Sequence, residues 1–188
     1  MAITVLDVRD IINRSVSVPT CAGVYAWYRR LDLNPSSRKN FLNSIEQIMT
    51  GNMWLPIEVP SKSGTIGPYR VRAVLSPPRR KLTGRKIPIA EALSATSASR
   101  AAMSRLAVDA SALQSPLYIG RAVNLRTRIV QGHLQNRTDF SRWVTRYVSF
   151  SQLIVAFVEI TSLPPNTCEI LESLVGTAGF PSYARRIG

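Results

Sequence analysis

The sequence has few acidic residues, few lysines and only one histidine. Its 24 Lys and Arg residues outnumber 11 Asp and Glu residues, which gives a formal net charge of +13 over 188 residues. Only four of the basic residues are lysines, so arginine carries the excess. Such an excess predicts attraction to a polyanion, and the planar guanidinium suits bidentate contact with phosphate oxygens and guanine edges. We therefore expect nucleic acid or an anionic membrane surface as the partner.

Long apolar runs and paired cysteines are also missing. The longest apolar run, residues 153–158, is far shorter than the roughly 20 residues that span a bilayer, so we expect no membrane segment. Asp7 and Asp10 interrupt the stretch where a secretion signal would be apolar. Cys21 and Cys168 form no metal-type spacing and are typical of reduced thiols in a cytoplasmic protein. These features favour nucleic acid over a membrane.

The apolar pattern predicts a mixture of helices and strands. Three-and-four spacing or a high Ala content predicts helices over residues 5–16, 37–49, 91–113, 123–134, 140–150 and 166–178. β-branched and aromatic runs predict strands over residues 23–29, 69–75, 117–120 and 153–160. Few strands in mixed order indicate an α+β fold, a small mixed or antiparallel sheet flanked by helices. We expect one domain over residues 1–188, with an insertion at residues 30–115.

Two of the expected strands carry a tyrosine beside a glycine. The first contains Gly23-Val24-Tyr25 and the second contains Tyr118-Ile119-Gly120. A tyrosine in a strand is most often a core or rim aromatic. Here, however, Arg128 follows Tyr118 by ten residues and lies on an expected helix. This combination resembles the GIY-YIG nuclease family, in which two such strands pair and the next helix carries an arginine.

The resemblance extends to the closing helix. The family places a glutamate there, followed by a proline nine residues later and an aromatic residue eleven residues later. Glu172, Pro181 and Tyr183 fit this pattern. The resemblance covers residues 23–29 and 117–183 and leaves the insertion unexplained. It implies an enzyme that cleaves phosphodiester bonds with a metal ion.

Helix geometry separately distinguishes the two glutamates of the closing helix. Asn166 and Glu169 have the spacing of a capping box, which gives Glu169 a structural role. Glu172 shares a helix stripe with Cys168 and Val175, so its carboxylate faces a largely apolar surface. A carboxylate there is costly unless it meets a cation. A buried arginine is one such cation, but we favour a metal ion and expect Glu172 to be its ligand.

The resemblance implies in-line hydrolysis with one Mg²⁺ or Mn²⁺ bound to Glu172, water and phosphate oxygens. Arg128 would neutralise charge on the scissile phosphate. Tyr25 would act as a general base or orient the attacking water, and Tyr118 would be its hydrogen-bonding partner. Since a tyrosine titrates near about 10, Tyr25 can act as a base only if nearby cations lower its pKa.

Two positions depart from the family pattern. A histidine is expected four residues after the arginine, but Gly132 occupies that position and His133 follows it. On an unbroken α-helix His133 would face the core, whereas a left-handed turn at Gly132 would re-aim its imidazole. A catalytic and a structural role for His133 both stay open. The family asparagine after Tyr183 is Ala184, which is compatible with reduced activity, replacement from the insertion or loss of catalysis.

The insertion contains a basic run that indicates contact with double-stranded DNA. A solvated loop is the alternative for five charges alone, but loops grafted onto a scaffold often carry specificity. Such insertions resemble those in the restriction-endonuclease branch of the family, which implies a homodimer acting on a palindromic site. The residues that we expect to bind DNA are Arg79, Arg80, Lys81, Arg85, Lys86 and Arg121.

Three alternatives stay open. A repair, recombination or mobile-element nuclease would read DNA structure instead of sequence, and a defined cut site on intact duplex would exclude it. A degenerate nuclease would bind DNA without cutting it. A basic RNA-associated protein would carry the motifs by chance, and preference for duplex DNA in competition would exclude it.

Overall fold

The computed structural model describes residues 2–50, 64–66, 69–71, 82–161, 164 and 166–179. The chain divides into two compact units, one formed by Met1–Asp32 with Arg105–Gly188 and the other by Leu33–Ser104. Six residues named above lie outside the described residues: Arg79, Arg80, Lys81, Pro181, Tyr183 and Ala184. In the part that is described, no helix is long and apolar enough to cross a membrane.

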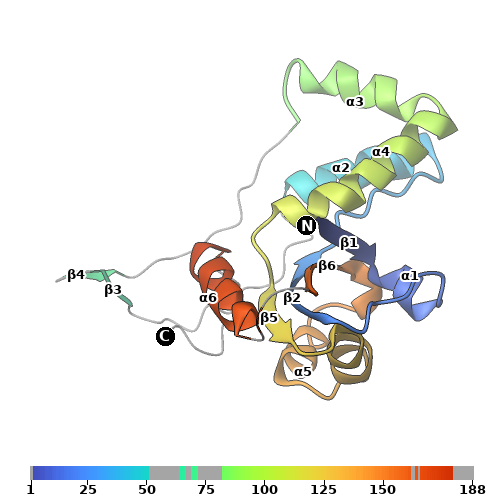
Figure 1. Ribbon diagram of the computed structural model, residues 1–188. Coiled ribbons are helices and arrows are strands. Elements are labelled where there is room, and N and C mark those ends of the chain that lie inside the picture. The colour runs from blue at the N-terminus through green and yellow to red at the C-terminus, as the bar shows by residue number, and fades with distance from the viewer. Residues whose placement is uncertain are drawn as a thin grey trace. The chain divides into compact units, whose positions relative to one another are not determined.

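The first unit is built on a four-stranded antiparallel sheet (Figure 1). The strands lie in the order β1 (Ile3–Asp7), β6 (Leu153–Ile160), β2 (Ala22–Arg29) and β5 (Tyr118–Ala122). Helices accompany the sheet, so the α+β class predicted from the sequence is confirmed. In the second unit, β3 (Gly64–Ile66) and β4 (Tyr69–Val71) pair antiparallel. The predicted strand over 69–75 is confirmed to residue 71, and its remainder lies outside the described residues.

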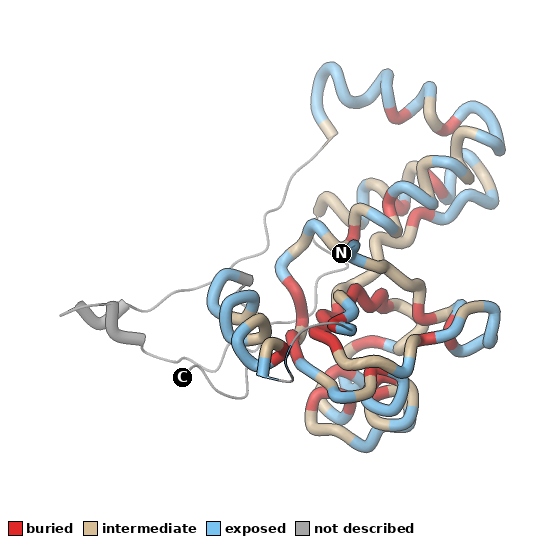
Figure 2. Tube along the Cα trace, viewed as in Figure 1, coloured by how far each residue is buried: buried red, intermediate tan, exposed pale blue. Residues whose placement is uncertain are grey.

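Burial explains why the two central strands were predictable. Residues Leu153, Ile154 and Val155 of β6 are fully buried, and β2 is buried from Gly23 to Trp27. In Figure 2 the red, buried segments concentrate in these strands, whereas helix α6 (Thr167–Gly179) is mostly exposed. The predictions for residues 23–29 and 153–160 are therefore confirmed.

The predicted helix over residues 5–16 is wrong in its first part. Residues up to Asp7 form β1, and only Val8–Ile12 form a short helix, α1. The β-branched residues Ile3 and Val5 pair with Val158 and Ala156 of β6. This pairing outweighs the helical spacing, and the Asp7 carboxylate then caps α1 by accepting from the Arg9 backbone N–H.

Two other predicted helices are interrupted. The helix over 91–113 is divided into α3 (Lys86–Ser94) and α4 (Ser97–Ala110), followed by a 3₁₀ turn η1 (Ser111–Leu113). Thr96 Oγ1 accepts from the Ser99 backbone N–H and so begins a new helix. The helix over 140–150 is shorter, α5 (Asp139–Val144), with a separate 3₁₀ turn η3 (Phe150–Gln152). The helix expected over 37–49 is confirmed as α2 (Arg38–Met49), capped by Ser37.

The alternation of side chains along β2 separates two packed faces. Val24 and Ala26 pack with Cys168 of α6, and Leu171 lies against the same cluster. The intervening residues, Tyr25 and Trp27, point to the other face because side chains alternate along a strand. That face meets the helical segment η2 (Thr127–Leu134) and α5 through ring contacts of Tyr25 and Trp27 with His133 and of Trp27 with Phe140.

Gly23 marks a close approach between β2, its neighbour β6 and the chain after β5. A Cβ built at Gly23 would lie 2.5 Å from the Val158 carbonyl oxygen and 2.7 Å from Leu125 Cδ1. The same construction at Gly176 of α6 meets nothing within 4 Å. A methyl group is therefore excluded at the first position and accommodated at the second.

We predict opposite effects of alanine at these two glycines. Gly23→Ala should lower the free energy of unfolding by about 1–3 kcal/mol, because backbone and core atoms must shift. Gly176→Ala should raise it by about 0.5–1 kcal/mol, because alanine is the better helix former. Urea denaturation of the three proteins measures both effects. A Gly23→Ala protein as stable as the unchanged chain would contradict the close approach.

Candidate active site

The two tyrosine motifs meet at Gly120. In the β2–β5 pairing Tyr25 lies opposite Gly120, and Trp27 lies opposite Tyr118. The ring centroids of Tyr25 and Tyr118 are 6.0 Å apart. A Cβ built at Gly120 would lie 2.7 Å from Tyr25 Oη and 2.9 Å from Tyr118 Oη. Both hydroxyls therefore converge over the backbone of Gly120, where only glycine leaves room for them.

Arg128 joins the two tyrosines. Its Nε donates a hydrogen bond to Tyr25 Oη over 3.2 Å. The segment that carries Arg128 is anchored to the chain just before β2, since the N–H groups of Leu125 and Arg126 donate to the Cys21 and Pro19 carbonyls. The sequence-predicted residues Tyr25, Tyr118 and Arg128 are thus brought together.

His133 belongs to the same cluster because the helix widens. The region predicted to be helical over residues 123–134 begins at residue 125, and Thr127–Leu134 form a π-helix, η2. Residues five apart point in directions about 140° apart on an α-helix, but a π-helix hydrogen-bonds residue i to i+5 and brings such residues onto one side. Arg128 and His133, five residues apart, can therefore both reach Tyr25.

The left-handed turn at Gly132, one of the two possibilities left open for His133, does not form. Among the described glycines only Gly84 has a positive φ, whereas Asn136 adopts the left-handed conformation with φ 57°. The helix continues through Gly132, and the Arg137 N–H donates to the Gly132 carbonyl five residues earlier. The imidazole of His133 therefore points toward Tyr25 because η2 is a π-helix, and not because the helix ends at Gly132.

A directed chain of hydrogen bonds runs through His133. Tyr25 Oη lies 2.7 Å from His133 Nε2, and His133 Nδ1 lies 2.7 Å from Thr138 Oγ1. Thr138 Oγ1 donates to Ser141 Oγ, which itself donates to the Thr138 carbonyl. Since the Thr138 hydroxyl proton is used, Thr138 must accept from His133 Nδ1–H. His133 Nε2 is then an acceptor, and Tyr25 donates to it.

Burial sets the protonation states along this chain. His133 is fully buried. Its burial, followed by the positive charge of Arg128, lowers the pKa of His133 to about 3. Burial and the neighbouring Tyr118 raise the pKa of Tyr25 above its ordinary value, and Arg128 does not offset this rise. Arg128 alone therefore does not lower the pKa of Tyr25 as a role as general base requires.

Glu172 of α6 meets a cation, Arg121 of β5. Arg121 Nε is 3.1 Å from Glu172 Oε2, and Arg121 Nη1 is 2.9 Å from Glu169 Oε2. Burial raises the pKa of Glu172 and Glu169 adds to the rise, whereas Arg121 and Arg128 oppose it. Glu169 thus has an ion-pairing role besides the predicted cap. The helix expected over 166–178 is confirmed as α6.

The acidic pair is compatible with a hard divalent cation. Carboxylate oxygens are the donors that Mg²⁺ and Mn²⁺ prefer. Within the described ranges no group of three or more His, Cys, Asp or Glu side chains is arranged to hold a metal ion. A cation held by Glu172 would therefore take its other ligands from water and substrate, as octahedral Mg²⁺ commonly does.

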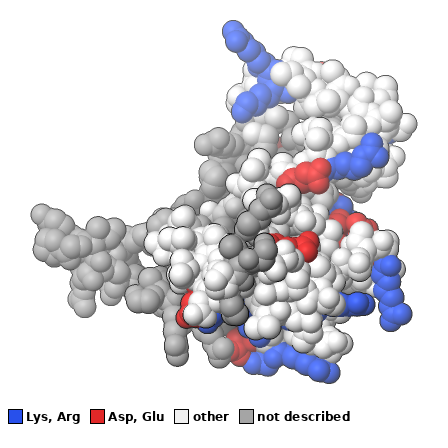
Figure 3. All heavy atoms as spheres, in the orientation of Figure 1, with Lys and Arg blue, Asp and Glu red and all other residues white. Residues whose placement is uncertain are grey.

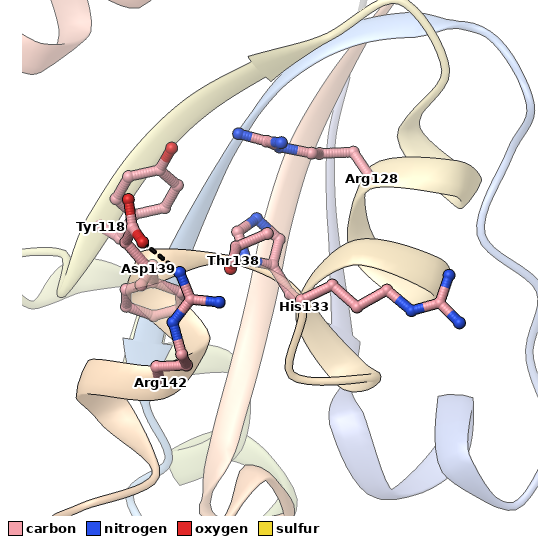
Figure 4. A pocket seen from close by; sticks show the side chains of 8 residues that line it. Tyr118, Arg128, His133, Thr138, Asp139 and Arg142 are labelled. Carbon is pink, nitrogen blue, oxygen red and sulfur yellow. Dashed lines mark hydrogen bonds and ion pairs between the residues drawn. The ribbon is translucent and has the colours of Figure 1, made fainter.

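A polar pocket opens beside Tyr118 and Arg128 (Figure 4). Figure 4 shows the Arg128 side chain extending toward Tyr118, with His133 and Thr138 between Arg128 and Arg142. The pocket has a volume of about 270 Å³. Sequence reasoning missed five of the residues that line it. These are Arg137, Thr138, Asp139, Phe140 and Arg142.

The missed residues left only a weak signal in the sequence. Thr138 and Ser141 have the spacing of a helix cap, and their side chains do form a capping box at the start of α5. That pattern predicts a helix start and not a hydrogen bond to His133. Arg137 and Arg142 look like ordinary surface arginines until the turn after η2 brings them to the pocket.

The predicted DNA-contacting residues fall in different parts of the chain. Arg85 and Lys86 are exposed at the start of α3, in the second unit. Arg121 is engaged by the two glutamates of α6. On the face shown in Figure 3, basic side chains lie along the lower edge, over α5 in the orientation of Figure 1.

Comparison with known proteins adds no assignment. No protein-family model matches the chain, and neither a curated protein nor a solved structure is significantly similar to it.

We predict that His133 stays neutral at pH 5. Because the chain has one histidine, nitrogen-15 NMR of histidine-labelled protein reports this site alone. We expect a protonated Nδ1 and an unprotonated Nε2, with no titration near the ordinary pKa of about 6.5. Titration between pH 6 and 7 would contradict the buried hydrogen-bond chain.

The same shift has a consequence for acid stability. Between about pH 6.5 and pH 3 the unfolded chain binds a proton that folded His133 does not, so stability falls as pH decreases. The slope from this group is at most about 1.4 kcal/mol per pH unit. His133→Gln removes this contribution to the pH dependence. The difference in unfolding free energy between the unchanged chain and His133→Gln, measured by urea denaturation, should therefore become smaller as the pH is lowered from about 6.5 to 3.

Proposed function

We propose that this chain is a metal-dependent endonuclease that hydrolyses DNA phosphodiester bonds, of the restriction or defence type. The observation that carries the proposal is the convergence of two tyrosine hydroxyls and one arginine over Gly120. A guanidinium beside the hydroxyl of Tyr118 suits a phosphate oxygen. Arg121 of β5 pairs with Glu169 and Glu172 of α6, and the charge of Arg128 also acts on the Glu172 carboxyl by opposing the rise in its pKa that burial causes. The net charge of +13 suits a polyanionic substrate.

In the proposed reaction Arg128 and Tyr118 contact the scissile phosphate, because both line the open pocket. Tyr25 lies behind them and is only 1% exposed. Its oxygen accepts from Arg128 Nε in the free protein. When Arg128 turns to the phosphate, that oxygen becomes available to accept a hydrogen bond from the attacking water. Tyr25 thereby orients the water, and its raised pKa opposes a role as base.

Glu172 is proposed to hold the metal ion. A bound Mg²⁺ or Mn²⁺ would polarise the phosphoryl oxygen and stabilise the leaving oxygen. Glu172 must exchange Arg121 for the cation, which leaves Arg121 paired with Glu169 and available to the DNA backbone. A restriction enzyme of this kind would act as a homodimer on a palindromic site, with the basic residues of the second unit contacting the duplex.

The test is cleavage of supercoiled plasmid DNA with Mg²⁺. Glu172→Gln keeps the shape of the side chain and removes its charge, so we expect cleavage to fall at least about 10²-fold. EDTA should abolish it. Glu159→Gln is the matched control, because Glu159 is exposed on β6 and contacts Cys21 instead of the cluster.

The products distinguish the alternatives. Discrete fragments support a sequence-specific enzyme. Nicking or smearing that depends on Glu172 indicates a structure-selective nuclease of repair or mobile elements. Salt-sensitive binding without cleavage by the unchanged chain would contradict the enzyme and indicate a DNA-binding protein.

A second prediction concerns the glycine between the two hydroxyls. Gly120→Ala places a methyl group within 3 Å of Tyr25 Oη and Tyr118 Oη. We expect the rate of cleavage to fall by about 10²-fold or more, because small misplacements of reacting groups have effects of that size. Gly176→Ala, which adds the same methyl group in open space, should leave the rate unchanged. Equal cleavage rates for the unchanged chain, Gly120→Ala and Gly176→Ala would show that the two tyrosine hydroxyls take no part in the reaction.

A further inference from the structure

The pocket beside the tyrosine cluster is strongly basic. Among the described residues that line it, three are arginines, Arg128, Arg137 and Arg142, and one carries a carboxylate, Asp139. His133 also lines it and is neutral, because burial and Arg128 lower its pKa to about 3. The lining therefore carries two more positive than negative charges. A pocket of this charge attracts an anion.

The carboxylate of Asp139 occupies a position on Arg142 where another anion could bind. Asp139 forms an ion pair with Arg142 three residues later on α5. Figure 4 shows this pair at the side of the pocket opposite the backbone of Arg128. The Arg142 side chain stays 55% exposed, so an oxyanion from solvent can reach it. Arg142 thus exchanges one oxygen ligand for another when a phosphate enters.

The pocket suits a phosphate better than a nucleobase. A base would need an open aromatic face on which to stack. The two aromatic rings of the lining, Tyr118 and Phe140, stack on each other with centroids 4.8 Å apart and planes 20° apart. Phe140 also packs against Trp27 and His133. The volume of about 270 Å³ is several times the roughly 30 Å³ of one water molecule, which is ample for a phosphate group.

We propose that this pocket binds the backbone phosphate next to the scissile one, through Arg142 and Arg137. The position of the scissile phosphate at Tyr118 and Arg128 rests on the proposed function. Arg128 lies between the two phosphates, since it contacts Tyr25 and also lines the pocket. The second contact fixes the register of the DNA strand, and Asp139 weakens it by competing for Arg142.

The test is the salt dependence of binding to a short labelled DNA duplex in EDTA, where no cleavage occurs. Each phosphate contact contributes about 0.9 to the slope of log K against log salt. Arg142→Gln and Arg137→Gln should each reduce the magnitude of the slope by about that amount. Arg146→Gln is the matched control. It removes the same charge from an exposed position beyond α5 that does not line the pocket.

Asp139→Asn should change the affinity for DNA in the opposite direction. It removes the competing carboxylate and should tighten binding several-fold, a result that misfolding cannot produce. Unchanged slopes for Arg137→Gln and Arg142→Gln would overturn the proposal, and so would an equal loss for Arg146→Gln. Weaker binding by Asp139→Asn would also overturn it.

The outcome is separate from that of the nuclease proposal. If the unchanged chain does not cut plasmid DNA but the salt slopes of the arginine variants change as expected, the phosphate pocket is supported and the nuclease activity is contradicted. If cleavage depends on Glu172 but the salt slopes of Arg137→Gln and Arg142→Gln equal that of the unchanged chain, the nuclease activity is supported and the phosphate pocket is contradicted.

Discussion

The site depends on one buried hydrogen bond, from Tyr25 Oη to His133 Nε2 over 2.7 Å. It joins β2 to the helix that carries Arg128, and it uses the only hydrogen that the Tyr25 hydroxyl can donate. The Tyr25 oxygen is then left as an acceptor for Arg128. In a buried environment such a bond is maintained because an unpaired hydroxyl or imidazole nitrogen would be costly. The π-helix is the backbone conformation that allows it.

Arginine partners dominate the electrostatics of the chain. With 11 acidic residues against 24 basic ones, carboxylates are scarce, and several are ion-paired with arginine: Asp7, Asp32, Asp139, Glu169 and Glu172. This arrangement places Glu169 and Glu172 beside Arg121 and Asp139 beside Arg142. These ion pairs are partly exposed and therefore weak, as is required by the proposed exchange of Arg121 for a cation and of Asp139 for a phosphate.

The sequence predicted three of the four strands of the sheet and the tyrosines and arginine of the cluster, because these are encoded locally. Strands β2 and β6 are runs of buried β-branched and aromatic residues, and β2 and β5, which carry the two tyrosine motifs, pair as the resemblance implies. Helical spacing failed at residues 5–7, where pairing with β6 decides the structure.

The geometry around His133 could not be predicted in the same way. No sequence pattern indicates a π-helix, so the sequence alone places His133 one residue beyond the position that the resemblance implies for a histidine. Thr138 was visible only as a helix cap, and its second role as acceptor from His133 depends on the fold of the turn. The pocket arginines likewise come together only through that turn.

The central claim of the proposed reaction is that water, and not the hydroxyl of Tyr25 or Tyr118, attacks the phosphate. The most direct measurement is a single turnover of DNA cleavage in water enriched in oxygen-18, with mass spectrometry of the products. We expect one oxygen-18 atom in the terminal phosphate of the product and no covalent adduct between protein and DNA. A product phosphate without the label, or a peptide containing Tyr25 or Tyr118 linked to DNA, would contradict the account.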